Sequence, residues 1–149
     1  MSMRVWTVSG FGVLESDLEK IKNETWLKFI EKFLPKDYDY MMDDLGENYN
    51  DEDLKNALQD FEDEDFNKGI GAIFAEAINN NEKDFYVECL QGVYFYENAI
   101  LYEDRQPWHM SDRVKGMTAK DMGEVFKKYL KELGLENIEP DEYSVEFYG

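Results

Sequence analysis

Two side chains of this protein have the chemistry of a nucleophile and of a general base. Cys89 and His109 are the one cysteine and the one histidine among its 149 residues. In thiol hydrolases an imidazole takes the proton of the thiol, so a cysteine–histidine pair is one candidate. No known motif surrounds either residue. Cys89 lies in the apolar run 85–90, which is typical of a small buried side chain, and His109 follows Trp108 in an expected loop. We therefore expect no catalytic residue and no enzymatic activity.

The 34 aspartates and glutamates raise the question of a calcium site or a glycosidase-type carboxylate pair. An EF-hand loop needs a glycine at its sixth position and a glutamate at its twelfth. A loop that starts at Asp60 or at Asp63 has neither residue in place. With so many carboxylates, a suitably spaced glycosidase pair arises by chance. We expect no metal ion and no other cofactor.

Two glycine pairs resemble nucleotide-binding motifs in part. The pair in residues 10–12 lacks the third glycine of a dinucleotide fingerprint. The pair in residues 69–71 begins an apolar helical pattern that lacks the lysine and hydroxyl of a phosphate-binding loop. Neither pair predicts a nucleotide site, and Gly10 and Gly12 are expected to form a sharp turn.

The negative charge of the chain is concentrated rather than spread. Of the formal net charge of -18, residues 37–65 contribute thirteen acids against one base, Lys55. Residues 135–149 add five acids and no base, while the other 105 residues hold sixteen acids and fifteen bases. Neighbouring like charges repel, so this concentration favours a role in binding. The alternative is a solvated surface that keeps the protein soluble.

The charge also defines the expected partner. Phosphate contacts need clustered lysine and arginine, so direct binding of nucleic acid is excluded. A carboxylate surface can instead occupy a channel built for DNA, which carries one charge per ~1.7 Å of its axis. We expect a basic nucleic-acid-binding protein as partner, contacted by acids and by nearby aromatic anchors. The predicted contact residues are Asp51, Glu52, Asp53, Asp60, Glu62, Asp63, Glu64, Asp65, Tyr49 and Phe66, with Tyr38 and Tyr40 nearby.

Composition and periodicity predict one α+β domain over residues 1–149. Hydrophobic residues make up 43% and aromatic residues 15%, which is enough for a core. One cysteine excludes a disulfide framework, and no apolar run has the length of a signal peptide or membrane span, so we expect a cytoplasmic protein with no membrane contact. Helical periodicity or cap signals are found in residues 16–21, 26–34, 38–45, 50–61, 70–78 and 118–133, and strand patterns in residues 4–9, 85–91, 99–103 and 143–148.

These elements predict a mainly antiparallel sheet of about four strands with several helices packed on it. Three local details accompany that prediction. Ser16 and Glu19 fit a capping box, and Asn50 is an expected N-cap. Trp108 follows a proline and has methionines nearby, so we expect it to be a buried anchor between its loop and the last helix.

Several segments outside the acidic stretch resemble a known family. They are residues 107–111, 115–118, 126–129 and 144–146, the terminal Gly149, and the glycines of residues 10–12. The chain is similar here to a family of uncharacterised small acidic proteins carried by prophages and mobile elements of Gram-positive bacteria. No catalytic residue is carried over from this resemblance. The resemblance implies a setting in which small acidic proteins inhibit host defence enzymes, some of them anti-CRISPR or antirestriction proteins that mimic the charge of DNA.

Charge and resemblance together predict a non-enzymatic inhibitor of a defence nuclease, a CRISPR or restriction enzyme, in the cytoplasm of a bacterial host. A binding module for a small molecule or a phage protein is the alternative. It would use an aromatic surface near Trp6, Trp108 and residues 94–96 (Tyr-Phe-Tyr). An enzyme that depends on Cys89 or His109 is the third and least favoured interpretation.

Overall fold

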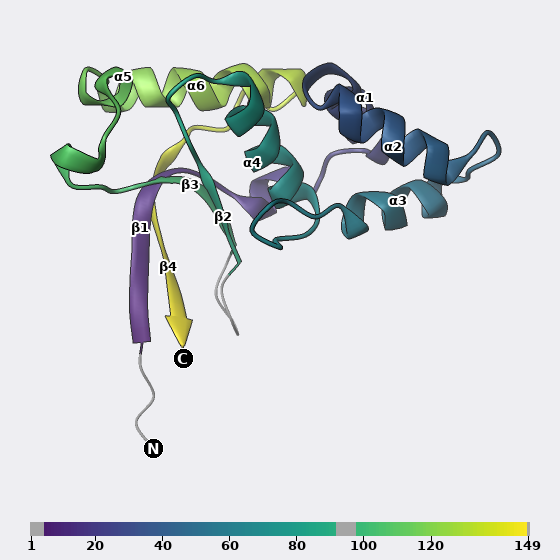
Figure 1. The fold of residues 1–149 in the computed structure, drawn as a ribbon, viewed down its shortest axis with the longest axis horizontal. Helices are drawn as coiled ribbons and strands as arrows, with labels where there is room; N and C mark the ends of the chain where they lie inside the picture. Colours follow the sequence, from purple (N-terminus) through teal and green to yellow (C-terminus); the bar gives the residue numbers. More distant parts are fainter. Residues whose placement is uncertain (1–4, 92–97, 149) are drawn as a thin grey trace.

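One four-stranded antiparallel sheet and six α-helices make up the described part of the chain, residues 5–91 and 98–148 of a computed structural model (Figure 1). The strands are ordered β2-β3-β1-β4, so the predicted α+β class is confirmed. In chain order the elements are β1 (Val5–Leu14), the 3-10 helix η1 (Glu15–Leu18), α1 (Asn23–Phe33), α2 (Pro35–Leu45), α3 (Asp51–Asp60), α4 (Ile70–Asn81), β2 (Glu88–Leu90), β3 (Ala99–Glu103), the 3-10 turn η2 (Pro107–His109), α5 (Asp112–Lys115), α6 (Ala119–Glu132) and β4 (Asp141–Tyr148).

The helices form two groups with different positions relative to the sheet. α4 contacts β2 and β3, and α6 contacts β1, so these two helices cover the sheet. α1 packs on α4, and α2 and α3 pack on α1, at the end of the molecule away from the strands (Figure 1). The acidic stretch 37–65 is therefore carried by this outer helical group.

Local sequence signals explain most helix boundaries. The apolar face of α1 is buried through Trp26, Phe29 and Ile30, as its spacing predicts. Asn50 caps α3, because its Oδ1 accepts from the Asp53 N–H at 2.8 Å and the Asp53 carboxylate accepts from the Asn50 N–H at 3.1 Å. These expectations are confirmed because each depends on side chains within one or two helical turns.

The expected turn at residues 10–12 is wrong, since β1 runs without interruption to Leu14. A β-carbon at Gly10 would collide with the carbonyl oxygen of Tyr102, and one at Gly12 with that of Ile100. Both carbonyls belong to β3, the antiparallel neighbour of β1. The two glycines therefore permit close approach of two backbones rather than a change of direction.

Two further local expectations are corrected. The capping box of Ser16 and Glu19 is wrong, because η1 already begins at Glu15, and the Asp17 carboxylate accepts from the Leu14 N–H at 3.4 Å. The strand expected over residues 85–91 shrinks to Glu88–Leu90. Ahead of it, the side chain of Asn79 donates to the Val87 carbonyl and accepts from the Val87 N–H, at 2.9 and 2.8 Å. An amide side chain here supplies the hydrogen bonds that a strand neighbour would supply.

Trp108 is not the buried anchor that its sequence context predicts, because 73% of its surface is exposed in η2. We expect Trp108→Ala to change the free energy of unfolding by less than ~0.5 kcal/mol, as for other surface substitutions. Phe126→Ala provides the positive control: this ring is fully buried against Phe85 and Phe11, so its loss should cost about 3–5 kcal/mol. Thermal unfolding of both variants measures the difference. A large loss in Trp108→Ala would mean that η2 packs more tightly than its exposure indicates.

Candidate functional site: an acidic groove between α2 and α3

Helices α2 and α3 pack on each other and place acids from two parts of the chain side by side. Pro35 occupies the first position of α2, where its missing N–H costs nothing. Gly46 ends the helix with a positive φ of 76°, and Asn50 starts α3 four residues later. This short connection between the two helices sets carboxylates of α2 opposite those at the end of α3.

The two helices enclose a groove of about 270 Å³. Four carboxylates line it, together with Met41, Ala57 and two aromatic rings, and none of its described lining residues is basic. The acids are Asp37 and Asp44 of α2, Asp60 at the end of α3, and Glu62 just beyond it. Tyr40, 80% exposed, also lines the groove. We call these four carboxylates and Tyr40 the acidic groove.

Burial and mutual repulsion both act on the acids around the groove. Burial raises the pKa of Asp37 above its ordinary value. The pKa of Glu76, on the neighbouring helix α4, is also raised, first by burial and then by the negative charges of Glu64, Asp63 and Asp37. Acids of α2, α4 and the turn after α3 thus share one electrostatic field. Their ionised forms cost free energy that a cation can offset.

The turn that connects α3 to α4 uses one of its acids to hold its own shape. The Asp63 Oδ1 accepts from the backbone N–H groups of Asp65 and Asn67, at 2.8 and 2.9 Å, as in an Asx turn. The Gly69 N–H closes the turn on the Phe61 carbonyl at 2.9 Å. Phe66 stands near its tip with a positive φ of 66° and is 80% exposed. Asp63 thus has a structural role in the turn, whereas the Phe66 ring is exposed to solvent.

The other predicted contact acids are divided between the two ends of α3. Asp51 accepts from the Asn23 amide at 3.3 Å and Asp53 caps its helix, so these two, with the exposed Glu52, lie at the start of α3. Of the remaining acids, Asp65 accepts from the Tyr86 hydroxyl at 3.1 Å, and Glu62 lies 3.8 Å from the Lys68 amine. Burial, followed by the Asp65 carboxylate, raises the pKa of Tyr86 to about 12.

Predicted and observed lining residues overlap only in part. Asp60 and Glu62 line the acidic groove, and Glu64 belongs to the field around it through Glu76. Tyr49 and Tyr38 are half-buried and pack on the main core, so they offer less surface than Tyr40. Sequence reasoning did not select Asp37 and Asp44, although both belong to the acidic stretch. Nothing in the sequence is a reason to select Glu76, because it lies in an apolar helical pattern outside the acidic stretch.

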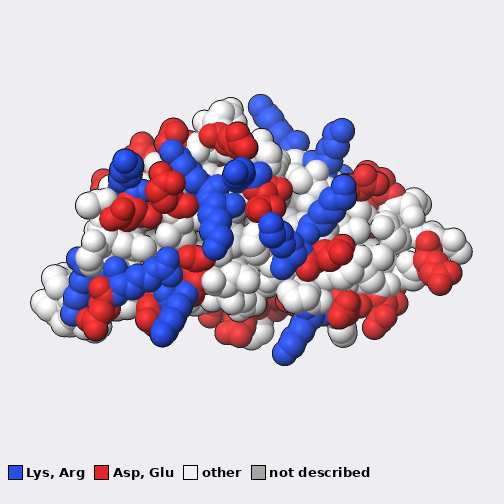
Figure 2. Space-filling model, turned by 90° about the horizontal axis from the view of Figure 1, so that it is seen from above, with Lys and Arg blue, Asp and Glu red and all other residues white. Residues whose placement is uncertain are grey.

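Figure 2 shows how charge is distributed on the face seen from above. Lysine and arginine side chains stand among acids over much of this face, and acidic side chains mark the end toward the α2–α3 connection. Ion pairs between the described residues include Lys32–Glu132, at 2.6 Å, and Lys127–Glu139, at 2.9 Å. On this face, negative charge is therefore segregated toward the α2–α3 connection.

The alternative sites are less well assembled. Cys89 is buried, and burial followed by the Glu15 charge raises the pKa of its thiol, which opposes thiolate chemistry. His109 is exposed in η2 and lines a different cavity from that of Cys89. Trp6 stacks on Phe147 at 5.8 Å. Residues 94–96 of the predicted aromatic surface lie outside the described residues.

The described residues show neither a cluster of metal ligands nor a membrane-spanning helix. Across residues 5–91 and 98–148, no three His, Cys, Asp or Glu side chains are grouped so that they could hold a metal ion. Within the same residues, no helix combines the length and the apolar character needed to cross a membrane. Comparison with family models, curated proteins and solved structures found no match to this chain.

Proposed function

We propose that this chain is a non-enzymatic inhibitor from a mobile element that binds a basic nucleic-acid-binding protein through the acidic groove. The observation that carries the proposal is the meeting of four carboxylates, from α2, α3 and the turn after α3, in a groove whose described lining includes no base. A DNA-binding channel supplies the complementary lysines and arginines. The partner class we propose is a host defence nuclease of the CRISPR or restriction type.

The electrostatics of the groove support a cationic partner. Asp37 and Glu76 have raised pKa values, so ionised carboxylates are held there at a cost in the free protein. Lysines or arginines brought by a partner would offset this cost, and coupling between close charge pairs across interfaces reaches ~1.5–7 kcal/mol. The exposed rings of Tyr40 and Phe66 add apolar anchors of the kind that dominate interface energies.

The exposure of Trp108 supports the second candidate function, a binding module with an aromatic surface. Trp108 is 73% exposed, and large exposed aromatic side chains are enriched at binding surfaces. A module that binds a small molecule or phage protein through Trp108 would bind with little dependence on salt. The acidic-groove inhibitor should instead bind with strong dependence on salt.

The decisive variant neutralises the groove with Asp37→Asn, Asp44→Asn, Asp60→Asn and Glu62→Gln, leaving Asp63 intact. We expect it to fold about as stably as the parent, because relief of repulsion offsets the loss of the exposed Glu62–Lys68 pair, worth at most ~1 kcal/mol. Its affinity for a defence nuclease should fall at least tenfold, or by ~1.4 kcal/mol. The measurement is displacement of a fluorescent DNA duplex from a panel of CRISPR and restriction nucleases, at low and high salt.

A matched control removes four acids elsewhere with Glu24→Gln, Glu124→Gln, Glu136→Gln and Glu142→Gln, all at exposed positions. This control should displace DNA like the parent, because its groove is intact. Equal displacement by the groove variant, or failure of the parent across the whole panel, contradicts the proposal. If both four-acid variants lose activity equally, net charge rather than the groove is responsible.

A further inference from the structure

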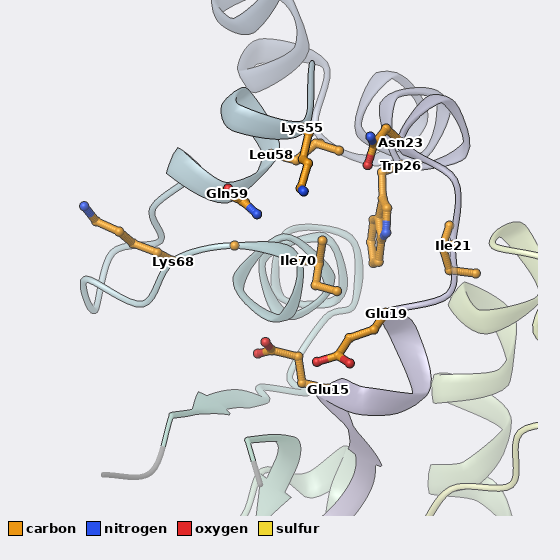
Figure 3. A pocket seen from close by; sticks show the side chains of 11 residues that line it. Glu15, Glu19, Ile21, Asn23, Trp26, Lys55, Leu58, Gln59, Lys68 and Ile70 are labelled. Carbon is orange, nitrogen blue, oxygen red and sulfur yellow. The ribbon is translucent and has the colours of Figure 1, made fainter. Parts of the chain in front are cut away.

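A second cavity lies on the other side of α3 from the acidic groove and combines both signs of charge. It has a volume of about 450 Å³, within the range of small-molecule sites. Its walls come from η1 and the segment after it, the start of α1, the middle of α3 and the start of α4 (Figure 3). Four separate parts of the chain thus converge on one opening.

Two carboxylates form one wall of this cavity, Glu15 and Glu19. Burial raises the pKa of Glu15, the side chains of Asn98 and Gln91 partly offset this through hydrogen bonds, and the Glu19 charge raises it further. One oxygen of Glu15, Oε2, is buried against the backbone of Gly71 and has no hydrogen-bond partner among the described residues. Glu19 is exposed, and among residues 5–91 and 98–148 neither it nor Glu15 is part of an ion pair, so no cation of these residues balances this wall.

Lys55 forms the opposite wall. In Figure 3 its amine points into the opening, as does the Gln59 amide beside it, whereas the Lys68 side chain extends away. Lys68 has its own partner, Glu62, at 3.8 Å. Within residues 5–91 and 98–148, Lys55 makes no ion pair, with Glu15 and Glu19 or with any other acid. The one base of the acidic stretch is thus held free above an apolar floor.

That floor separates the two charged walls. Trp26 and Leu58 are almost fully buried yet line the cavity, and Ile70 lies with Trp26 between the lysine and the glutamates (Figure 3). A ligand that reached both walls would cover this surface with its own apolar part. A single charged group would leave one wall uncompensated.

We propose that this cavity binds a small aminocarboxylate whose two charges lie at opposite ends of a short apolar chain. The ammonium group would lie against Glu15 and Glu19, and the carboxylate would accept from Lys55 and the Gln59 amide. The methylene chain would lie over Trp26 and Ile70. This site is independent of the acidic groove, because it uses none of the carboxylates that line it.

The test uses the full chain and 6-aminohexanoate as probe, followed by calorimetry and by the NMR signal of the Trp26 indole N–H. Hexylamine and hexanoate each carry one of the two charges, and glycine carries both without the chain. We expect 6-aminohexanoate to bind at least tenfold more tightly than any of the three and to shift the Trp26 signal. Equal binding of hexylamine or hexanoate would overturn the proposal. Absence of any binding of 6-aminohexanoate at about 10 mM, the highest concentration tested, would overturn it too.

Two variants assign the walls. Lys55→Met and Glu19→Gln change exposed side chains and should leave the melting temperature nearly unchanged, while each lowers the affinity for 6-aminohexanoate at least tenfold. Lys28→Met and Glu24→Gln, on the exposed side of α1, are the matched controls and should bind like the parent. Unchanged affinity in Lys55→Met contradicts the assignment. Lys55→Met should still displace DNA from a nuclease as the parent does, because the acidic groove is unchanged. The ligand-binding proposal and the inhibitor proposal can therefore fail independently of each other.

Discussion

Glu82→Gln is expected to lower the free energy of unfolding by about 2–4 kcal/mol, because this side chain joins three helices. Only 9% of it is exposed, at the C-terminal end of α4. Its Oε1 accepts from Arg113 of α5 at 2.9 Å, and its Oε2 accepts from Lys128 of α6 at 3.2 Å and from the Tyr129 hydroxyl at 2.7 Å. An amide nitrogen in place of one oxygen would face a donor, leaving a buried hydroxyl or guanidinium group without its acceptor.

The effect should depend on pH with a definite sign. Burial alone would raise the pKa of Glu82, but the hydrogen bonds from Tyr129, Arg113 and Lys128 outweigh it and lower the pKa below 4.5. The stabilisation is therefore present above pH 4.5 and lost as the pH falls through the lower pKa of the folded state. Denaturant unfolding of parent and variant at several pH values should show the two curves converging in acid.

Glu76→Gln is the matched control, since it changes another glutamate of the same helix. The pKa of Glu76 is raised, so its charge costs stability once the pH exceeds that raised value. The variant should be as stable as the parent, or more stable, at pH 7, and should lose this advantage in acid. If Glu82→Gln and Glu76→Gln destabilise equally, the hydrogen-bond network of Glu82 is not what holds the helices together.

Gly12→Ala is expected to be the second strongly destabilising change, at about 3 kcal/mol. The added methyl group would meet the carbonyl oxygen of Ile100, a backbone atom that cannot rotate away. Relief requires that β1 and β3 separate at their closest approach, which breaks ladder hydrogen bonds on both sides of the Gly12–Leu101 pair. For a domain of this size the melting temperature should fall by ~6–12 °C.

Gly123→Ala tests whether steric collision, rather than loss of glycine itself, is the cause. A β-carbon at this position in α6 would lie 3.8 Å from the Phe11 ring, which is ordinary contact. Alanine also favours helix by ~1 kcal/mol over glycine, so this variant should match or exceed the stability of the parent. An equal loss in both variants would contradict the close approach of β1 to β3.

How far the sequence predicts the fold depends on where the deciding partner lies. Asn50 was identifiable as a cap because its partner, Asp53, is three residues away, and Thr118 and Asp121 have the same spacing at the start of α6. Gly12 was misinterpreted because the atom that excludes its side chain belongs to residue Ile100, far along the chain. The exposure of Trp108 likewise follows from how η2 lies on the surface, which neighbouring residue types do not specify.

The same distinction applies to the candidate site. Counting acids located the charged stretch, but the meeting of Asp37 with Asp60 requires that α2 and α3 pack together. Asp63 belongs to the acidic run that predicted the contact residues, yet its carboxylate forms an Asx turn. Only the backbone geometry shows this role. The acids near the C-terminal end have another explanation: Asp141 and Glu142 are exposed on β4, an edge strand, where charge opposes pairing with other chains.

The position of β1 between β3 and β4 has a consequence for how the chain folds. Both neighbours of this first strand are synthesised late, and Val5 pairs with Tyr148 near the opposite end of the sequence. Contacts between such distant residues require closure of a long loop, which slows folding. During synthesis on the ribosome, α1 to α4 can therefore emerge and associate before β3 and β4 are available to pair with β1. The sheet should be completed only when β4 has left the exit tunnel.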